Sequence, residues 1–193
     1  VAAVAPALDV PVVLRLARQH DWPAGYESEY CPTLQPLVSS LADCIEQGLL
    51  LLIDYGYGRA EYYHPQRSMG TLMCHYRHHS HADPLRYPGL QDITAFVDFT
   101  DIAYAAVDLG LEVAGYTTQS AFLLSNGLAE LHAEQVPQGT DTDSVRKQVS
   151  LSQQVKTLTL PGEMGDRFKV LAISKNLSTD IDGFAMLDLR NRL

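Results

Sequence analysis

The sequence predicts an α/β fold in which helices and strands alternate along a single domain. Apolar side chains recur at helical spacing in several segments, and the apolar runs between these segments are too short for buried helices. A chain of 193 residues has room for one domain of ordinary size. Its net charge of −9 repels a phosphate backbone and an anionic membrane surface, which excludes nucleic acid as a default partner.

The first part of the pattern predicts a helix followed by a central strand. Residues 34–45 place apolar side chains on one helical face, with Thr33 as the N-cap and Gly48 as the stop. The next run, Leu49–Ile53, is apolar on both faces, which is typical of a central parallel strand.

Regular structure resumes at Asp98 or Thr100, either of which can cap a helix that ends at Gly110. The later expected elements are a strand at Leu111–Thr118, a helix at Gln119–Ala133 weakened by Gly127, a polar connection at Glu134–Asp143, a helix with an apolar stripe of Val145, Val149, Val155 and Leu158, and a strand at Phe168–Ile173. A sheet of only three firm strands leaves an edge unpaired, so we expect further strands that this sequence does not contain.

Residues 54–92 form a long insertion rich in Tyr and His, with one strand candidate at Thr71–Tyr76. Five of the seven histidines lie in it, at positions 64, 75, 78, 79 and 81. If the segment is extended, His75, His79 and His81 share a face; if it is helical, His75, His78 and His79 do. Imidazoles so placed can bind a metal, as in a metal-dependent hydrolase, but no H-E-x-x-H motif is present and arginines interrupt the cluster. We therefore predict no metal site, and a loop whose rings pack over a cleft.

Carboxylates near strand ends are the first candidates for catalysis, because ligands of open α/β sheets collect at the carboxyl ends of strands. Asp54 directly follows Leu49–Ile53, where it can orient a cationic substrate, accept a proton or merely cap the next turn. Asp92 precedes an apolar stretch rather than a helix, whereas helix capping is the favoured interpretation of Asp98 and Asp101.

Two further patterns are less informative. The run from Gly56 to Glu61 half-resembles a dinucleotide fingerprint, but Glu61 stands where the third glycine belongs and no helix follows to hold a pyrophosphate. The cysteines Cys31, Cys44 and Cys74 match no metal, haem or redox spacing and are predicted to be reduced thiols in a cytosol. Val1–Val10 lacks the basic start of a signal peptide, and no apolar run approaches the roughly 18 residues of a membrane span.

Several long motifs resemble the MidA-like family of class I S-adenosylmethionine-dependent methyltransferases. They are the runs Leu49–Gly56, Arg59–Ser68, Gly70–His78, Pro88–Phe99, Gly115–Gln119, Phe122–Leu124, Leu160–Gly165 and Phe168–Val170. The resemblance implies a Rossmann-like sheet in which Leu49–Ile53 is the fifth strand, Leu111–Thr118 the sixth and Phe168–Ile173 the antiparallel seventh. It also implies the cofactor S-adenosylmethionine, held by a glycine-rich loop and an acid that this sequence lacks.

We therefore expect residues 1–176 to be the C-terminal portion of one methyltransferase domain, inactive by itself, with its cofactor-binding residues elsewhere. The tail at 177–193 has no clear place, and the pattern leaves open whether it is disordered or docks through Phe184, Met186 and Leu187. A bacterial cytoplasmic location is expected, and homo-oligomerisation is left open.

Mitochondrial relatives in the family methylate a protein arginine during assembly of respiratory complex I, so the resemblance implies a protein substrate such as an assembly subunit. A carboxylate should then hold the guanidinium, and we assign this role first to Asp54 and second to Asp92 or Asp98. The expected substrate-binding residues are Tyr55, Gly56, Tyr63, Arg67, Tyr76 and His81. The alternative function is a non-catalytic protein-binding module that uses the Tyr- and His-rich loop.

Overall fold

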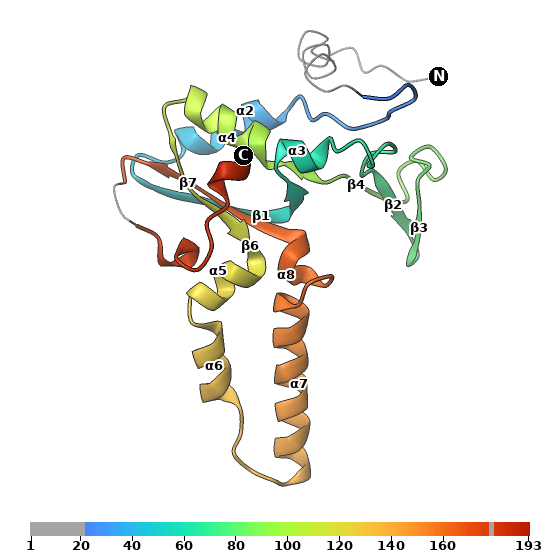
Figure 1. Cartoon of the computed structure of the whole chain (residues 1–193). Helices are drawn as coiled ribbons and strands as arrows, with labels where there is room; N and C mark the ends of the chain where they lie inside the picture. The colour runs from blue at the N-terminus through green and yellow to red at the C-terminus, as the bar shows by residue number, and fades with distance from the viewer. Residues whose placement is uncertain (1–21, 178–179) are drawn as a thin grey trace.

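A mixed four-stranded sheet forms the centre of the computed structural model, which describes residues 22–177 and 180–193 (Figure 1). Its strands lie in the order β5 (Val97–Asp98), β1 (Gly48–Tyr57), β7 (Phe168–Lys175) and β6 (Glu112–Thr118). β1 runs parallel to β5, and β7 runs antiparallel to both β1 and β6. The α/β class and the antiparallel last strand are confirmed, whereas the prediction for residues 1–10 lies outside the described residues.

Helices α2 (Leu34–Asp43) and α4 (Phe99–Asp108) cover one face of this sheet. The core there includes Val38 of α2, Phe99 of α4 and Leu171 of β7, none more than 1% exposed. Thr33 occupies the N-cap position of α2 as predicted, although its side chain makes no capping bond. α2 ends at Asp43 rather than at Gly48, because Gly48 already begins β1.

The opposite face is covered by α5 (Gln119–Ser125) and by the C-terminal segment, where η1 (Asp182–Phe184) places Phe184 against β6 and β7. Phe184 is 6% exposed and lies 5.4 Å from the Phe122 ring, centroid to centroid. Gly115 leaves the room it fills, because a Cβ at Gly115 would lie 2.3 Å from the Phe184 ring. Residues 180–193 therefore dock, and end in η2 (Arg190–Arg192); Met186 and Leu187 remain exposed.

β1 differs from the predicted central strand in two respects. It continues through Asp54, Tyr55 and Gly56 to Tyr57, so these residues lie within the strand rather than after it. Its side chains alternate, and the face formed by Leu49, Leu51 and Ile53 is between 37% and 49% exposed. One edge pairs with β7 at eight positions, but the other pairs with β5 only at Gly56 and Tyr57. Within the described residues, most of that edge is thus unpaired.

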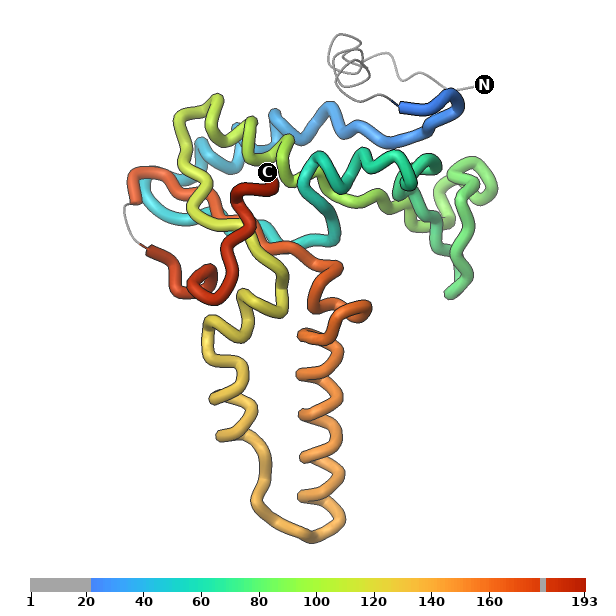
Figure 2. Tube along the Cα trace, viewed as in Figure 1, coloured from blue at the N-terminus to red at the C-terminus, as the bar shows by residue number. Residues whose placement is uncertain are grey.

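Two helices, α6 (Leu128–Gln135) and α7 (Thr142–Thr159), extend away from the sheet as an arm (Figure 2). The single helix predicted at Gln119–Ala133 is wrong, since Gly127 adopts φ +83° and separates α5 from α6. Asp141 caps α7 by accepting hydrogen bonds from the amides of the first turn. The predicted stripe of α7 is buried only in part, because Val145 and Val149 are 44% and 51% exposed.

The insertion folds into a second, three-stranded sheet in the order β3–β2–β4. Its strands are β2 (Met73–Tyr76), β3 (His79–His81) and β4 (Asp92–Thr94), so the strand candidate at Thr71–Tyr76 is confirmed and has two partners. Arg77 and His78 turn the chain between β2 and β3 with φ of +48° and +65°. Two short helices, α3 (Arg59–Tyr62) and α8 (Met164–Arg167), flank the carboxyl end of β1. No helix in the described part of the chain combines the length and apolar character required to cross a bilayer.

The docking of the C-terminal segment gives a first prediction. Phe184→Ala leaves a cavity between Gly115 and Phe122, so we expect it to lower the free energy of unfolding by about 3 kcal/mol. Met186→Ala, at a 60% exposed position two residues later, should change it by less than about 0.5 kcal/mol. Urea denaturation followed by circular dichroism measures both, and equal effects of the two variants would refute the docking.

Candidate functional site

A cavity of about 540 Å³ opens at the carboxyl end of β1, between the small sheet and the segment that contains α8. Its aromatic walls are Tyr55, Phe96 and Phe168. The Tyr55 ring lies 4.9 Å from Phe168 and 5.6 Å from Phe96, centroid to centroid. Ligands of open α/β sheets bind at this end of the strands, and a concave, largely apolar pocket with a few charged groups is the usual form of such a site.

Three charged side chains line the cavity: Glu163, Arg67 and Arg167. Glu163 precedes α8 and Arg167 ends it, so one short element places both at the rim. Arg67 donates from Nε to the backbone oxygen of Glu61 at 3.2 Å, and its guanidinium carbon lies 4.4 Å from the centre of the Tyr57 ring. These two contacts hold Arg67 in one orientation and leave its remaining N–H groups available.

The wall formed by the small sheet is fixed by the carboxylate of Glu29. Its Oε1 accepts hydrogen bonds from the amides of Thr71 and Leu72 at 2.7 Å each. The Thr71 hydroxyl accepts in turn from the amide of Phe96 at 2.9 Å. Gly70 is required beside this contact, because its φ is +68° and a Cβ there would lie 2.2 Å from Glu29 Oε1. Hydrogen bonds to charged groups are strong, so they position the Phe96 side of the cavity.

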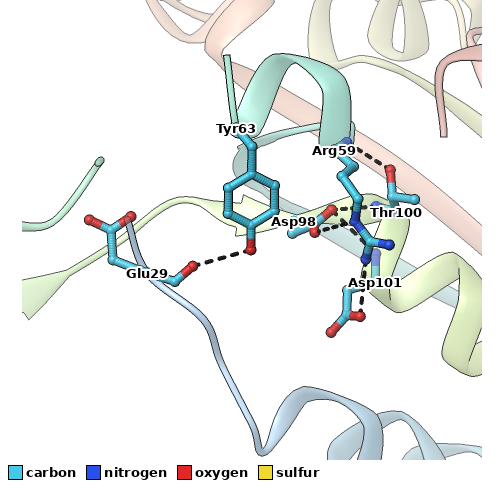
Figure 3. Close-up of polar contacts among 6 residues, drawn as sticks. All are labelled: Glu29, Arg59, Tyr63, Asp98, Thr100 and Asp101. Carbon is cyan, nitrogen blue, oxygen red and sulfur yellow. Dashed lines mark hydrogen bonds and ion pairs between the residues drawn. The ribbon is translucent and has the colours of Figure 1, made fainter. Parts of the chain in front are cut away.

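A partly buried ion-pair network lies behind this wall, centred on Arg59 at the start of α3 (Figure 3). The guanidinium donates to Asp98 Oδ2 at 3.1 Å and to Asp101 Oδ1 at 3.2 Å, while the Arg59 amide donates to Thr100 Oγ1 at 2.8 Å. Asp98 also caps α4, accepting from the amides of Thr100 and Asp101. Burial raises the pKa of the Asp98 carboxyl, and Arg59 opposes that rise. The capping interpretation of Asp98 is confirmed, and the same side chain also holds α3.

Two tyrosines pack beside the network in a second cavity of about 200 Å³. Tyr62 and Tyr63 are 3% and 4% exposed, and Tyr63 donates its hydroxyl proton to the backbone oxygen of Glu29 at 3.3 Å (Figure 3). Burial raises the pKa of both phenols far above the usual value. These side chains are neutral hydrogen-bond donors throughout the physiological range.

The predicted substrate-binding residues divide among different places. Tyr55 and Arg67 line the first cavity, and Tyr63 lines the second together with Asp98. Gly56 is buried under β5, where a Cβ would lie 2.2 Å from the oxygen of Val97, so it permits strand packing and faces no cavity. The structure thus brings together two of the six predicted residues at the carboxyl end of β1.

Tyr76 and His81 share the face of the small sheet that lies away from the first cavity. The register pairs Tyr76 with His79 and Cys74 with His81, whereas His75 pairs with Asp92 on the other face. The expectation that His75 shares a face with His79 and His81 is wrong, because the turn at Arg77–His78 reverses the chain. Among residues 22–177 and 180–193, no three potential metal ligands come together.

The two other acids predicted to be catalytic do not line the first cavity. Asp54 pairs in register with Lys169, and neighbouring side chains of a strand point to opposite faces, so Asp54 faces away from Tyr55. Its Oδ1 accepts a hydrogen bond from the Tyr55 amide at 2.8 Å. Asp92 is exposed on β4. It pairs in register with His75 of β2, and of these two residues only His75 is among those that line the cavity.

Glu163 is the carboxylate that the sequence interpretation missed. Glu163 lies in the motif Leu160–Gly165, which resembles the family but received no predicted role. Candidate acids were sought at the ends of strands, and no strand ends at Glu163. Phe96 and Phe168 were missed because they come from segments 72 residues apart in the sequence, both of which pack against Tyr55. No local spacing could have indicated that meeting.

The described residues do not form a cradle for a nucleotide cofactor. Two glycines lie near the carboxyl end of β1: Gly56 is the next-to-last residue of the strand, and Gly58 directly follows it. A Cβ at Gly58 would lie 2.4 Å from the backbone oxygen of Arg192, so this chain itself fills the space beside both glycines.

The sheet order, the antiparallel β7 and a pocket at the carboxyl end of β1 define an α/β protein of the Rossmann-like, ligand-binding class. Comparison with protein families matches residues 3–117 to the family described as "Putative S-adenosyl-L-methionine-dependent methyltransferase". The chain belongs to this family. The resemblance found in the sequence motifs is thereby confirmed.

Curated relatives include the mitochondrial protein arginine methyltransferase NDUFAF7 of Danio rerio, 31% identical over 147 residues, and its Drosophila melanogaster homologue, 32% identical over 143. These matches span 75% and 70% of this chain, but only 32% and 29% of the relatives. Two solved structures from Burkholderia thailandensis, both of the COG1565 superfamily, are 39% identical with a TM-score of 0.87. They match 98% of this chain and 49% and 47% of their own length; the second is a "likely methyl transferase" bound to S-adenosyl-homocysteine.

The Arg59 network predicts an unequal cost of substitution. Arg59→Met leaves two poorly exposed carboxylates without their cation, and should lower the free energy of unfolding by about 3 kcal/mol or more. Asp98→Asn keeps a capping side chain but loses the charge, and the double variant should cost less than the sum of the single ones. Arg146→Met, which breaks the exposed pair with Asp143, is the control and should cost less than about 1 kcal/mol. Additive effects at Arg59 and Asp98 would exclude coupling.

The buried tyrosines predict a loss of stability in alkali. An unfolded chain releases phenolic protons near pH 10.0, whereas folded Tyr62 and Tyr63 retain theirs, so the folded state binds more protons and stability falls as the pH rises above 10. The slope per tyrosine is at most about 1.4 kcal/mol per pH unit. Denaturation of the protein and of its Tyr62→Phe, Tyr63→Phe variant between pH 8 and pH 11 should show a steeper fall for the unsubstituted protein. Parallel curves would contradict the burial.

Proposed function

We propose that the protein containing this chain transfers a methyl group from S-adenosylmethionine to an arginine side chain of a protein substrate. Membership of the methyltransferase family, the arginine methyltransferases among the relatives and the S-adenosyl-homocysteine bound to a 39% identical structure support the proposal. The observation that carries the acceptor assignment is a cavity at the carboxyl end of β1 with aromatic walls and one carboxylate, Glu163.

A guanidinium is planar, cationic and rich in donors, and the cavity offers a counterpart to each property. Tyr55 and Phe168 present rings to a flat cation, and a carboxylate accepts two parallel N–H bonds from it. The role assigned to Glu163 is to orient the guanidinium and to accept the proton that its nitrogen loses when the methyl group is transferred. The cofactor, when bound, supplies the electrophilic methyl carbon.

The cofactor contacts in this proposal come from residues other than those described. The chain spans about half the length of the solved structures and about a third of the curated relatives that it matches. Asp54 and Asp92 are the alternative acids for this role: Asp92 pairs in register with the cavity-lining His75, and Asp54 lies on the other face of β1. Their separate positions make the three acids distinguishable by mutation.

The decisive experiment compares Glu163→Gln, Asp92→Asn and Asp54→Asn in the complete protein, with tritiated S-adenosylmethionine and a protein substrate. We expect Glu163→Gln to lower kcat at least about 100-fold while the dissociation constant of S-adenosyl-homocysteine stays the same, because the lost carboxylate contacts the acceptor. Asp54→Asn should leave turnover within about threefold of the unsubstituted protein.

Amino-acid analysis of the labelled product identifies the acceptor. Label in methylarginine supports the proposal, whereas label in another residue removes the arginine assignment and leaves the methyltransferase. Unchanged turnover in Glu163→Gln together with a large loss in Asp54→Asn would place the acceptor on the opposite face of β1.

A further inference from the structure

The arginines of the described residues fall into two groups according to their partners. Four form ion pairs with carboxylates: Arg59 with Asp98 and Asp101, Arg146 with Asp143, Arg190 with Asp188, and Arg192 with Glu61. The other four, Arg67, Arg77, Arg86 and Arg167, form no ion pair within residues 22–177 and 180–193. The chain has 23 acidic residues and 14 basic ones, so carboxylates outnumber cations and four arginines nevertheless have no carboxylate partner among the described residues.

Two of the unpaired arginines line the same cavity. Arg67 enters from the loop before the small sheet and Arg167 from the end of α8, and together they outnumber Glu163, the cavity's one carboxylate among the lining residues described. The charge of the cavity is thus opposite in sign to that of the chain as a whole. A single guanidinium acceptor uses Glu163 and leaves both arginines without an anion.

Arg67 is prepared for such an anion. Its hydrogen bond to the Glu61 oxygen and its stacking on Tyr57 fix the plane of the guanidinium, so an incoming carboxylate need not order it. Arg77 and Arg86 also stack on aromatic rings, Tyr76 and Tyr87 at 5.3 Å each, but they do not line this cavity. They provide a natural control for the effect of position.

We propose that Arg67 and Arg167 form a carboxylate-binding subsite that selects substrate segments in which the acceptor arginine has Asp or Glu neighbours. The inference rests on the proposed function, whose acceptor group it places beside Glu163. The two arginines bind the flanking carboxylates, and the repulsion between the negatively charged chain and an acidic substrate is overcome locally at this rim. A basic flanking sequence meets like charge at the same place and is rejected.

The test measures peptide binding directly in the complete protein, by fluorescence anisotropy and without methyl transfer. Three labelled peptides share a central arginine and carry four flanking Glu, Gln or Lys residues. We expect the Glu peptide to bind about tenfold more tightly than the Gln peptide, and the Lys peptide to bind least, with a preference that weakens as salt rises.

Four variants locate the effect. Arg67→Gln with Arg167→Gln should abolish the preference for Glu, and Arg167→Gln alone, at an exposed side chain that does not threaten folding, should reduce it about threefold. Arg67→Lys keeps the charge but loses the planar fork, and should fall between the double variant and the unsubstituted protein. Arg86→Gln removes an equally unpaired arginine outside the cavity and should leave the preference unchanged.

The outcomes separate this inference from the proposed function. Equal binding of the Glu and Gln peptides, a preference that survives the double substitution, or an equal loss in Arg86→Gln overturns the subsite even if arginine methylation is demonstrated. Loss of S-adenosyl-homocysteine binding in the double variant also overturns it, because the arginines then hold the cofactor's carboxylate. If a single-stranded oligonucleotide displaces the labelled peptide as strongly as unlabelled Glu peptide does, the cavity binds phosphate. That result also overturns the subsite. A Glu preference that depends on Arg67 and Arg167 sustains the subsite even if no methyl transfer is found.

Discussion

The contact between Arg59 and Asp98 is the constraint on which the carboxyl end of β1 depends. β1 and β5 pair at only two positions, so hydrogen bonds between the strands hold this edge of the sheet weakly. Arg59 lies two residues after the end of β1 and Asp98 ends β5. Their ion pair joins the two strand ends, and Asp98 also caps α4. Removing either charge would leave the other poorly solvated, which makes the connection specific. Both cavities are lined in part by residues of β1 or the segment after it, and by residues just before Asp98.

One side chain cannot readily serve both this purpose and catalysis. Asp98 accepts three hydrogen bonds, from the amides of Thr100 and Asp101 to its Oδ1 and from Arg59 Nε to its Oδ2. A carboxylate so committed holds structure in place. Glu163 is exposed at the rim and makes no comparable bonds within the described residues, so it can accept bonds from a substrate group. The surroundings therefore commit the Asp98 carboxylate to the structure and leave the Glu163 carboxylate open to a ligand.

The sequence predicted what local periodicity determines and missed what depends on distant segments. β6, β7, α4 and the strand at Thr71–Tyr76 follow from alternation, capping by Asp98 and glycine stops, and the structure agrees. The break at Gly127 and the turn at Arg77–His78 were missed because positive φ values overrode helix and strand patterns that continue across them. Of the residues predicted to bind substrate, Tyr55 and Arg67 line the first cavity at the carboxyl end of β1. Glu163, Phe96 and Phe168 reach it only through tertiary packing.

The exposed face and open edge of β1 bear on how the cavity would work. Leu49, Leu51 and Ile53 alternate along a strand whose second edge is mostly unpaired within the described residues, and such strands readily accept another strand. A strand added there would end beside Tyr55, because β1 carries the ring to the cavity wall. In the proposed function, Arg67, Arg167 and Glu163 bind the acceptor segment at this end of β1, and the methyl donor has to reach the same cavity because the group passes directly from donor to acceptor.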